Sequence, residues 1–278
     1  VGLVMNMYYT RLLVPDIRLK MCYVHWIKVK ELISAGIWNS ISRLSQVLSD
    51  GLDLVITNIW ISAYLMGELS IAQQIPTYIS TLTNTLINLF SPNLTMYYAK
   101  DDTEAVVKEL KLSMKFSSFF VNIIFCVLVV FGKYFVQLWV PNQDVNLIYS
   151  LLVVIMMSLM VSGVTTSLNN VFLITNRLKV NSIFWLIISF TNVLLVFIYL
   201  NTTSLGIYAV AGVSKVTGIL GNLIFVPLYA CKCLKIKWNT FYPIIFRYIG
   251  TTFIMMIAFF GIKRLYVLPI NWITFFVV

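Results

Sequence analysis

The sequence predicts an all-α, polytopic integral membrane protein, a helix bundle with about seven to eight transmembrane helices. First, 60% of its 278 residues are hydrophobic and 11% are charged, with a mean hydropathy of +0.89, which excludes a water-soluble globular domain. Second, apolar runs of membrane-crossing length recur along the chain, and a hydrocarbon core of roughly 30 Å needs about 20 such residues per helix. Third, Lys and Arg gather in every second loop between these runs.

The predicted crossings are apolar runs that end at charged or turn-forming residues. The first two carry polar stripes, and the fourth has a milder stripe of Ser, Thr and Asn. The fifth ends at the uncharged loop NTTSLG, the sixth contains a lysine, and the seventh precedes a further apolar run. The crossings are 32–60, 66–98, 113–138, 147–175, 180–200, 205–230 and 241–262, with an eighth beginning at 265.

The segment DDTEAVVKELKLSMK, residues 101–115, has a helical apolar stripe with charges elsewhere. The stripe consists of Val106, Val107, Leu110 and Met114. This pattern predicts a short helix at the membrane interface that leads into the third crossing.

The basic residues fix the predicted topology. If the crossings alternate, the basic loops all lie on one side, and the positive-inside rule makes that side cytoplasmic. The net charge of +10 then follows from topology and contact with anionic membrane lipids, so we expect no nucleic-acid partner. The basic-side residues are Arg11, Arg18, Lys20, Lys28, Lys30, Lys100, Lys108, Lys111, Lys115, Arg177, Lys179, Lys232, Lys235 and Lys237.

Three regions are expected. Residues 1–30 form the end of a preceding span and a basic cytoplasmic loop, 31–230 form a six-helix lobe, and 231–278 hold a cytoplasmic loop and two C-terminal helices. Because the first residue is Val1 and the chain ends inside an apolar run, we expect the sequence to be part of a longer chain. Neither the cysteine spacing nor the single His25 indicates a metal or a cofactor.

The first crossing contains six polar residues spaced 4, 3, 4, 3 and 4 apart, which aligns them along one helical face. They are Asn39, Arg43, Gln46, Asp50, Asp53 and Thr57. The second crossing has a similar stripe, formed by Gln73, Thr77, Ser80, Asn84, Asn88, Ser91 and Thr95. Pro76 and Pro92 predict kinks or ends there. Two such faces indicate a shared aqueous cavity, although interhelical hydrogen bonding is an equal alternative for each polar residue.

Two cations are predicted to lie near the membrane midplane. Counting about 1.5 Å per residue from the helix ends places Arg43 and Lys215 at a similar depth, where a charge needs a cavity or a partner. Such a pair favours an anionic ligand. The alternatives are that Arg43 is neutralised by Asp50 or Asp53, and that Lys215 reaches the interface or pairs elsewhere. Asp53 lies closer to the outer boundary, where solvation is an alternative.

Three stretches resemble a known family. They are ELISAGIWNSISRLSQVLSDGLDLVI, GELSIAQQIPTYISTLTNTLINLFSPNLTMYYAKDD and LGIYAVAGVSKVTGILGNLIFVPLYACKCLKI. They resemble the seventh, eighth and twelfth helices of bacterial polysaccharide flippases, the O-antigen or capsule repeat-unit exporters of the multidrug/oligosaccharidyl-lipid/polysaccharide superfamily. The resemblance covers roughly residues 10–262 and implies the second lobe of a two-lobed flippase, without its N-terminal lobe.

The resemblance implies translocation of an undecaprenyl-pyrophosphate-linked oligosaccharide across the bacterial cytoplasmic membrane, and a partial chain that is inactive without its N-terminal lobe. Arg43 and Lys215 would face the pyrophosphate. Sugar-binding partners would be Gln46, Asn84 and Asn88. Asp50 or Asp53 would be a charge partner or a coupling-ion site. The expected partners are the lipid-linked oligosaccharide, membrane lipids and other polysaccharide-assembly membrane proteins.

Other functions remain open from the sequence. A cation-coupled multidrug exporter would share the fold and an intramembrane Asp, and a peptidoglycan-precursor flippase would carry a similar anion. A membrane-embedded polysaccharide-processing enzyme would need a long outer loop or a His/Asp constellation, and neither is visible. We therefore expect a transporter rather than an enzyme. A non-transporting helix bundle is disfavoured by the polar stripes.

Overall fold

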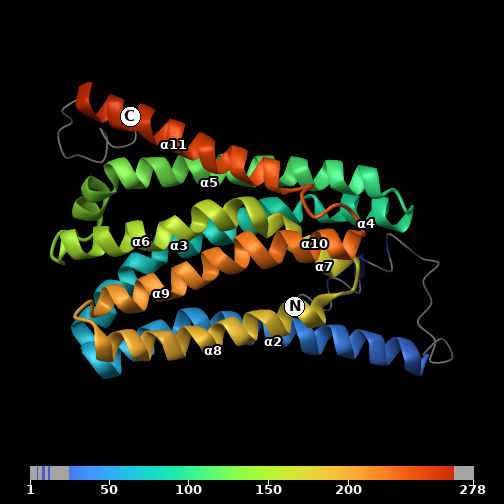
Figure 1. Ribbon diagram of the computed structural model, residues 1–278, viewed down its shortest axis with the longest axis horizontal. Helices are drawn as coiled ribbons and strands as arrows, with labels where there is room; N and C mark the ends of the chain where they lie inside the picture. The colour runs from blue at the N-terminus through green and yellow to red at the C-terminus, as the bar shows by residue number, and fades with distance from the viewer. Residues whose placement is uncertain (1–4, 6–7, 10–11, 13–24, 266–278) are drawn as a thin grey trace.

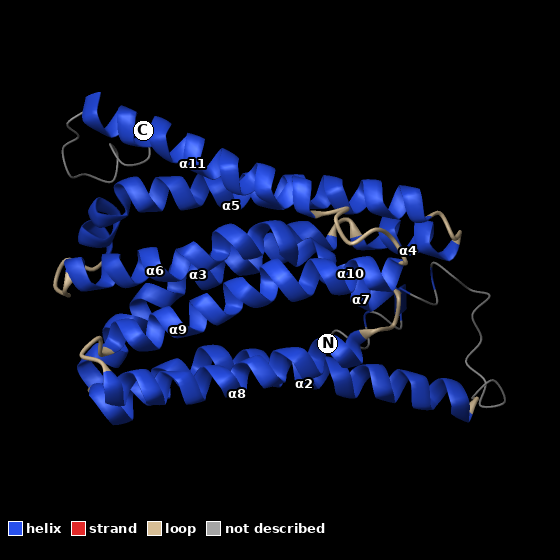
Figure 2. Ribbon diagram, viewed as in Figure 1, coloured by secondary structure: helices blue, strands red, loops and turns tan. Residues whose placement is uncertain are grey.

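The computed structural model describes Met5, Tyr8, Tyr9, Leu12 and residues 25–265. Within these residues the secondary structure is helical and contains no strand, which confirms the predicted all-α class (Figures 1 and 2). The predicted eighth crossing from 265, and most of the predicted region 1–30, lie outside the described residues.

The described helices follow the predicted crossings closely. Short π- or 3₁₀-helical turns, labelled η, extend or join several of them. The elements are α2 (Trp26–Ile56) with η2 (Thr57–Ile61), α3 (Ala63–Asn88), α4 (Ser91–Ala99), α5 (Thr103–Trp139), α6 (Val145–Thr165) with η3 (Thr166–Leu168) and α7 (Asn169–Ile174), α8 (Leu178–Thr202), α9 (Ile207–Leu220) with η4 (Gly221–Phe225) and α10 (Val226–Leu234), and α11 (Tyr242–Leu265).

Five of the helical segments in the described part of the chain are long and apolar enough to cross a membrane by length and composition alone. They are Thr103–Trp139, Val145–Ile174, Leu178–Thr202, Ile207–Leu234 and Tyr242–Gly261. Helices α2 and α3 are equally long but more polar. They nevertheless pack along α8 and α6, which meet the criterion, so they run through the same layer (Figure 1). The protein is a multi-pass membrane protein.

Two predicted boundaries differ from the structure. The first helix begins at Trp26, inside the predicted cytoplasmic loop. The predicted crossing 66–98 is two helices, because the chain turns at Leu89 and Phe90. Pro92 starts the second of them, at a position where a helix needs no backbone donor, whereas Pro76 is buried inside a continuous α3.

The predicted helix at 101–115 is present and leads into the third crossing, but its predicted position at the membrane interface is wrong. Asp102 caps α5 by accepting a hydrogen bond from the Ala105 amide at 2.9 Å, and the helix then continues unbroken to Trp139. The apolar stripe is not available to a membrane surface, because Val106, Leu110 and Met114 are completely buried. They pack in a cluster with residues of α4, α7, α10 and α11. The same amphipathic pattern therefore serves packing within the bundle.

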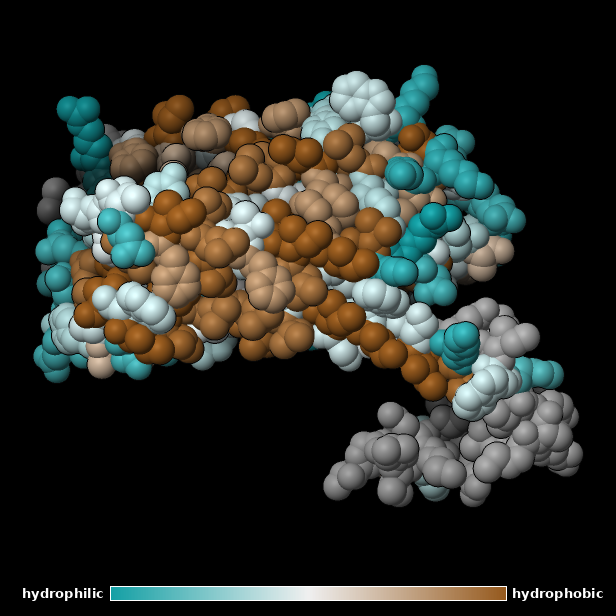
Figure 3. All heavy atoms as spheres, turned by 60° about the horizontal axis from the view of Figure 1, so that its bottom comes forward, coloured by the Kyte–Doolittle hydropathy of each residue, from teal (hydrophilic) through white to brown (hydrophobic). Residues whose placement is uncertain are grey.

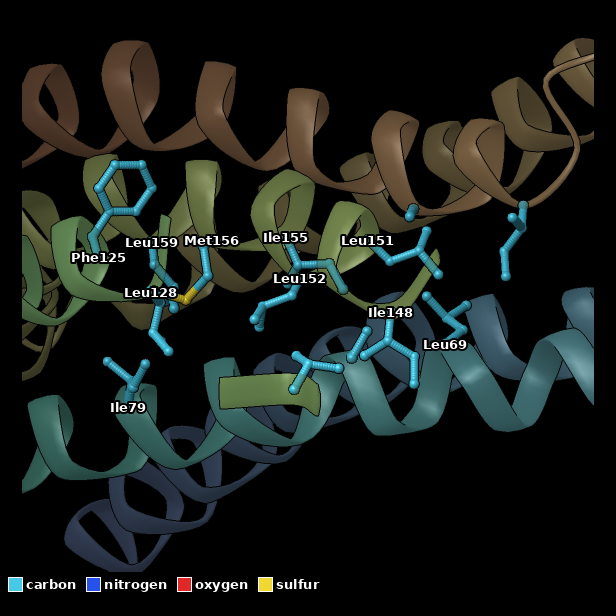
Figure 4. Packing of buried hydrophobic residues seen from close by; sticks show 14 of the residues in the cluster. Leu69, Ile79, Phe125, Leu128, Ile148, Leu151, Leu152, Ile155, Met156 and Leu159 are labelled. Carbon is cyan, nitrogen blue, oxygen red and sulfur yellow. The ribbon is translucent and has the colours of Figure 1, made fainter. Parts of the chain in front are cut away.

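The main core lies between α3, α5, α6 and α9. In Figure 4 the labelled side chains, Leu69 and Ile79 from α3, Phe125 and Leu128 from α5, and Ile148 to Leu159 from α6, interleave in one layer. Helix α6 is the central element, since Ile148, Leu151, Leu152 and Met156 are all at most 2% exposed. The polar ends of the molecule flank a broad apolar belt in Figure 3, as expected for a bundle that faces lipid.

Helices α5 and α6 approach each other closely at Gly163. A Cβ atom on Gly163 would meet Val121 at 2.9 Å, and the Ser117 hydroxyl donates to the Gly163 carbonyl at 2.7 Å. Small residues and short hydrogen bonds hold membrane helices together, because lipid offers no hydrophobic driving force between them. Helix packing here depends on the absence of a side chain at position 163.

We expect Gly163→Ala to destabilise the bundle by about 1–3 kcal/mol, since the added methyl group overpacks against Val121. Thermal unfolding of the purified protein in detergent measures the effect. The matched control is Gly212→Ala on α9, where a Cβ meets nothing within 4 Å. Equal melting temperatures for the two variants would show that the α5–α6 contact is not tight in solution.

Candidate functional site

The predicted site residues fall into two groups. Arg43, Gln46, Asn84 and Asn88 are exposed, whereas Asp53 is 1% exposed. Lys215 is half-buried. The side chain of Asp50 lies outside the described part of the structure. The two groups therefore need separate explanations.

The orientation of α2 is fixed by its contact with α8. The Ser182 hydroxyl lies 2.7 Å from that of Ser42 and 2.8 Å from the carbonyl of Trp38, to which it donates. Two helical turns further along both helices, the Ser189 hydroxyl donates to the Ser45 carbonyl at 3.0 Å. The two helices thus run parallel in constant register. Small polar side chains of this kind join membrane helices at close range.

With the serine face of α2 turned to α8, the polar stripe lies about 100° further around the helix. Asn39, Arg43 and Gln46 are accordingly exposed. Arg43 and Asp53 are ten residues apart, or about 15 Å along the axis, so the alternative in which Asp53 neutralises Arg43 is wrong. The first half of the stripe is an outward-facing polar surface of the described bundle.

Helix α3 also exposes a polar face. The hydroxyls of Thr77, Thr81 and Thr85 each donate to the carbonyl four residues earlier, at 2.8–2.9 Å. These three residues, with Asn84 and Asn88, are exposed. The threonine hydroxyls are satisfied by their own helix, while the asparagine amides can offer both donors and acceptors to a ligand. In Figure 1, α2 lies behind α8 and α3 lies behind α6, so both helices belong to the far side of the view.

These exposed faces conflict with lipid contact. A charged residue near the centre of a bilayer costs at least about 2.5–3.5 kcal/mol on insertion scales, and uncompensated amides add to this cost. Yet α2 and α3 pack beside helices that are apolar enough to span the membrane. Contact with water or with another polar protein surface would avoid this cost, and the predicted cavity stays a prediction.

A second, buried polar cluster joins α2, α8 and α9. The Ser214 hydroxyl lies 2.7 Å from both carboxylate oxygens of Asp53, and the Asn192 amide donates to the Ser214 oxygen at 3.0 Å. The Thr57 hydroxyl donates to the Asp53 carbonyl at 2.7 Å. The solvated position considered for Asp53 is wrong, because these groups enclose the carboxylate. Asp53 and Lys215 each make a further interaction.

One oxygen in this cluster has no protein partner. The Asn192 Oδ1 atom is buried and accepts no hydrogen bond, although buried polar atoms are nearly always satisfied. Asp53, Ser214 and Asn192 bring oxygen atoms from three helices to one level of the bundle, and oxygen is the ligand type that hard cations prefer. A buried carboxylate of this kind is a candidate site for a proton or a small cation.

The structure also corrects the predicted depth of the two cations. Lys215 directly follows Ser214, which contacts Asp53, so Lys215 lies near the level of Asp53. Arg43 is then on the order of 10–15 Å away from it along the helix axis. The two cations do not share one depth. Lys215 lies at the level of the buried carboxylate cluster, and Arg43 belongs with the exposed face.

Sequence reasoning missed Ser214 and Asn192. A signal for Asn192 was present, because Ser182, Ser189 and Asn192 are spaced seven and three apart and therefore share one face of α8. Ser214 gave no signal of its own. A single Ser in an apolar helix is common, and only the packing of α9 against α2 and α8 brings it to Asp53.

Fold and site together define a multi-pass, all-α membrane protein with a buried carboxylate cluster and two exposed polar helix faces. The chain is 26% identical over 238 residues to a Bacillus subtilis (strain 168) protein named "Uncharacterized membrane protein EpsK". The alignment covers 86% of this chain and 47% of the relative, so the chain spans about half the relative's length. No family model matches the chain, and no solved structure matches it significantly.

We expect Ser214→Ala to destabilise the protein by about 1.5–3 kcal/mol, because it removes a donor from a buried carboxylate. Thermal unfolding in detergent at neutral pH measures the loss. Thr217→Val is the control, since the Thr217 hydroxyl lies on the same helix and donates to the backbone carbonyls of Val213 and Ser214. A loss no larger than that of the control would mean that Ser214 does not support Asp53.

Proposed function

We propose that this chain forms one lobe of a flippase that moves an undecaprenyl-pyrophosphate-linked oligosaccharide repeat unit across the bacterial cytoplasmic membrane. The observation that carries the proposal is the exposed polar surface of α2 and α3, which includes Arg43, on helices that pack beside candidate membrane-spanning helices. Such a surface suits one wall of a water-filled path between two lobes. The twofold greater length of the aligned relative is compatible with a second lobe.

The exposed residues match the chemistry of the proposed cargo. The guanidinium of Arg43 can form paired hydrogen bonds with phosphate oxygens, which a lysine cannot do. Gln46, Asn84 and Asn88 offer amide donors and acceptors at exposed positions, which suit sugar hydroxyls. The polyprenyl tail would stay in lipid while the polar head follows this wall. Membrane lipids and other polysaccharide-assembly membrane proteins are the further partners we propose.

Lys215 is proposed to act at a later stage of the path. It lies about 10–15 Å from Arg43 along the helix axis, so a pyrophosphate would meet the two cations in succession. The neighbouring Asp53 cluster limits the net positive charge at this level. An anion held by Arg43 could therefore move outward without becoming trapped between two unneutralised cations, and no catalytic step is required.

The Asp53 cluster favours one alternative function. A cation-coupled multidrug exporter of the same superfamily would also need a buried carboxylate whose occupancy changes during transport. The exposed Arg43 argues for anionic cargo, which a peptidoglycan-precursor flippase would share. An embedded polysaccharide-processing enzyme is the least supported of these alternatives.

We expect the double variant Arg43→Glu/Lys215→Glu, made in the full-length gene of the native host, to lower surface polysaccharide at least tenfold. Reversed charges would repel the pyrophosphate on both levels of the path. Quantification of surface polysaccharide, together with the lipid-linked repeat units that accumulate in the membrane, measures the effect.

The matched control is Lys100→Glu/Lys108→Glu, which reverses two exposed charges near the start of α5. Both variants must reach the membrane in equal amounts by immunoblot. Unchanged polysaccharide in the Arg43→Glu/Lys215→Glu strain would contradict the proposed cargo path. Unchanged polysaccharide together with lost drug resistance would support the multidrug exporter.

Cation binding at the Asp53 cluster has a separate test. We expect Na⁺, compared with choline at equal ionic strength, to raise the melting temperature of the purified protein by a few degrees, because a ligand that binds the folded state stabilises it. Asp53→Asn should abolish this difference. Asp101→Asn is the control, since Asp101 is exposed and has a positive φ that Asn also tolerates. An equal Na⁺ response in both variants would exclude Asp53 as the site.

A further inference from the structure

An apolar groove of about 450 Å³ lies between α8 and the segment α9–η4–α10. Its volume falls within the roughly 300–1,000 Å³ range of small-molecule sites. All but one of its lining residues are apolar or aromatic residues or glycine, and the exception is Lys232. The lining residues are Phe184, Ile188, Leu220, Gly221, Ile224, Phe225, Leu228, Tyr229 and Lys232.

The π-helical turn η4 and a row of aromatic rings form the floor of the groove. Phe184 stacks on Phe225 with ring centroids 3.7 Å apart, and Phe225 stacks on Tyr229 at 5.2 Å. Gly221 is the first residue of this turn and lies beside Trp185. A Cβ atom on Gly221 would meet the indole ring of Trp185 at 3.0 Å. Turns of this kind often occur at functional sites, because the extra residue in the turn displaces neighbouring side chains. Ile224, which is 54% exposed, borders the open side of the groove.

The charged end of the groove lies at the basic side of the bundle. Lys232 is exposed in the last turn of α10. The Tyr229 hydroxyl donates to the backbone carbonyl of Arg177 at 3.2 Å, which ties the groove to the turn before α8. By the positive-inside rule this is the cytoplasmic end. The groove thus combines an apolar channel with a cation at the level of the lipid headgroups.

The length of the groove indicates what it holds. Leu220 and Lys232 are 12 residues apart on a continuous helical segment, a span of about 18 Å. This is close to half of the roughly 30 Å hydrocarbon core. An acyl chain of a lipid in the cytoplasmic leaflet would fill the groove from end to end. A long polyprenyl carrier would extend beyond it.

We propose that this groove binds an anionic glycerophospholipid of the cytoplasmic leaflet, with one acyl chain between α8 and α10 and its phosphate at Lys232. The length of the groove, about 18 Å, distinguishes it from a site for a long polyprenyl carrier. The site is independent of the cargo path on α2 and α3. Its bound lipid would hold α10 against α8 at the π-helical turn.

The experiment is native mass spectrometry of the full chain in detergent, titrated with phosphatidylglycerol. We expect Lys232→Glu to weaken retention of phosphatidylglycerol at least fivefold, since one lysine near an anionic lipid surface corresponds to about fivefold in affinity. Lys237→Glu is the matched control. Lys237 is exposed at the same end but does not line the groove, and it should reduce binding less than twofold.

A second variant tests the apolar channel without touching charge. Ile224→Trp should fill the groove and also weaken phosphatidylglycerol retention at least fivefold, whereas Leu194→Trp, at a position that is 64% exposed on α8 outside the groove, should not. Equal melting temperatures with phosphatidylcholine exclude misfolding as the cause. Equal losses in Lys232→Glu and Lys237→Glu, equally tight binding of phosphatidylcholine, or displacement by polyprenyl phosphate would each overturn the proposal.

Discussion

The contact between the Asp53 carboxylate and the Ser214 hydroxyl is the constraint on which the rest of the arrangement depends. A carboxylate that is 1% exposed needs donors, and in this bundle Ser214 lies 2.7 Å from both of its oxygens. That requirement places the end of α2 against α9, and Asn192 extends the contact to α8. Asp53 and the serine contacts with α8 together fix the orientation of α2. Gln46 shares the helical face of Asp53, so its exposure reflects its position along α2, two turns before the level of Ser214.

Two kinds of helix contact coexist around this constraint. Helix α6 packs through large apolar side chains that interleave with α3 and α5 (Figure 4). Helices α2 and α8, and locally α5 and α6, instead approach through serine and glycine, with hydroxyl-to-carbonyl hydrogen bonds of 2.7–3.0 Å. Contacts through serine and glycine are needed where both helices are surrounded by lipid, because burying more apolar side-chain surface adds little stability there. The contact between α2 and α8 can therefore be narrow and still fix the register of the two helices.

Most of the fold could be predicted from hydropathy, since seven apolar runs correspond to seven helical segments of the described chain. Prediction from the local sequence pattern failed where a tertiary contact decided the environment of a helix face. The stripe of Val106, Leu110 and Met114 is as amphipathic as an interfacial helix, but it is completely buried against the bundle. The predicted depth of the two cations was wrong for a related reason. Counting from the predicted ends placed Arg43 and Lys215 together, whereas the Ser214 contact shows how far α9 is shifted relative to α2.

The polar residues of this bundle are consequently of two physical types, and sequence spacing alone did not separate them. One type is satisfied within the described bundle, as with Ser182, Ser189 and Asp53, and it fixes helix register. The other type, represented by Arg43, Asn84 and Asn88, is exposed on helices too polar to face acyl chains over their whole surface. An amphipathic surface at membrane depth avoids the cost of lipid contact only by meeting water or polar protein, and the proposed cargo path would supply both. The lipid groove on α8 and α10 lies on other helices, so the polar and apolar parts of an amphiphile would meet different surfaces of this protein.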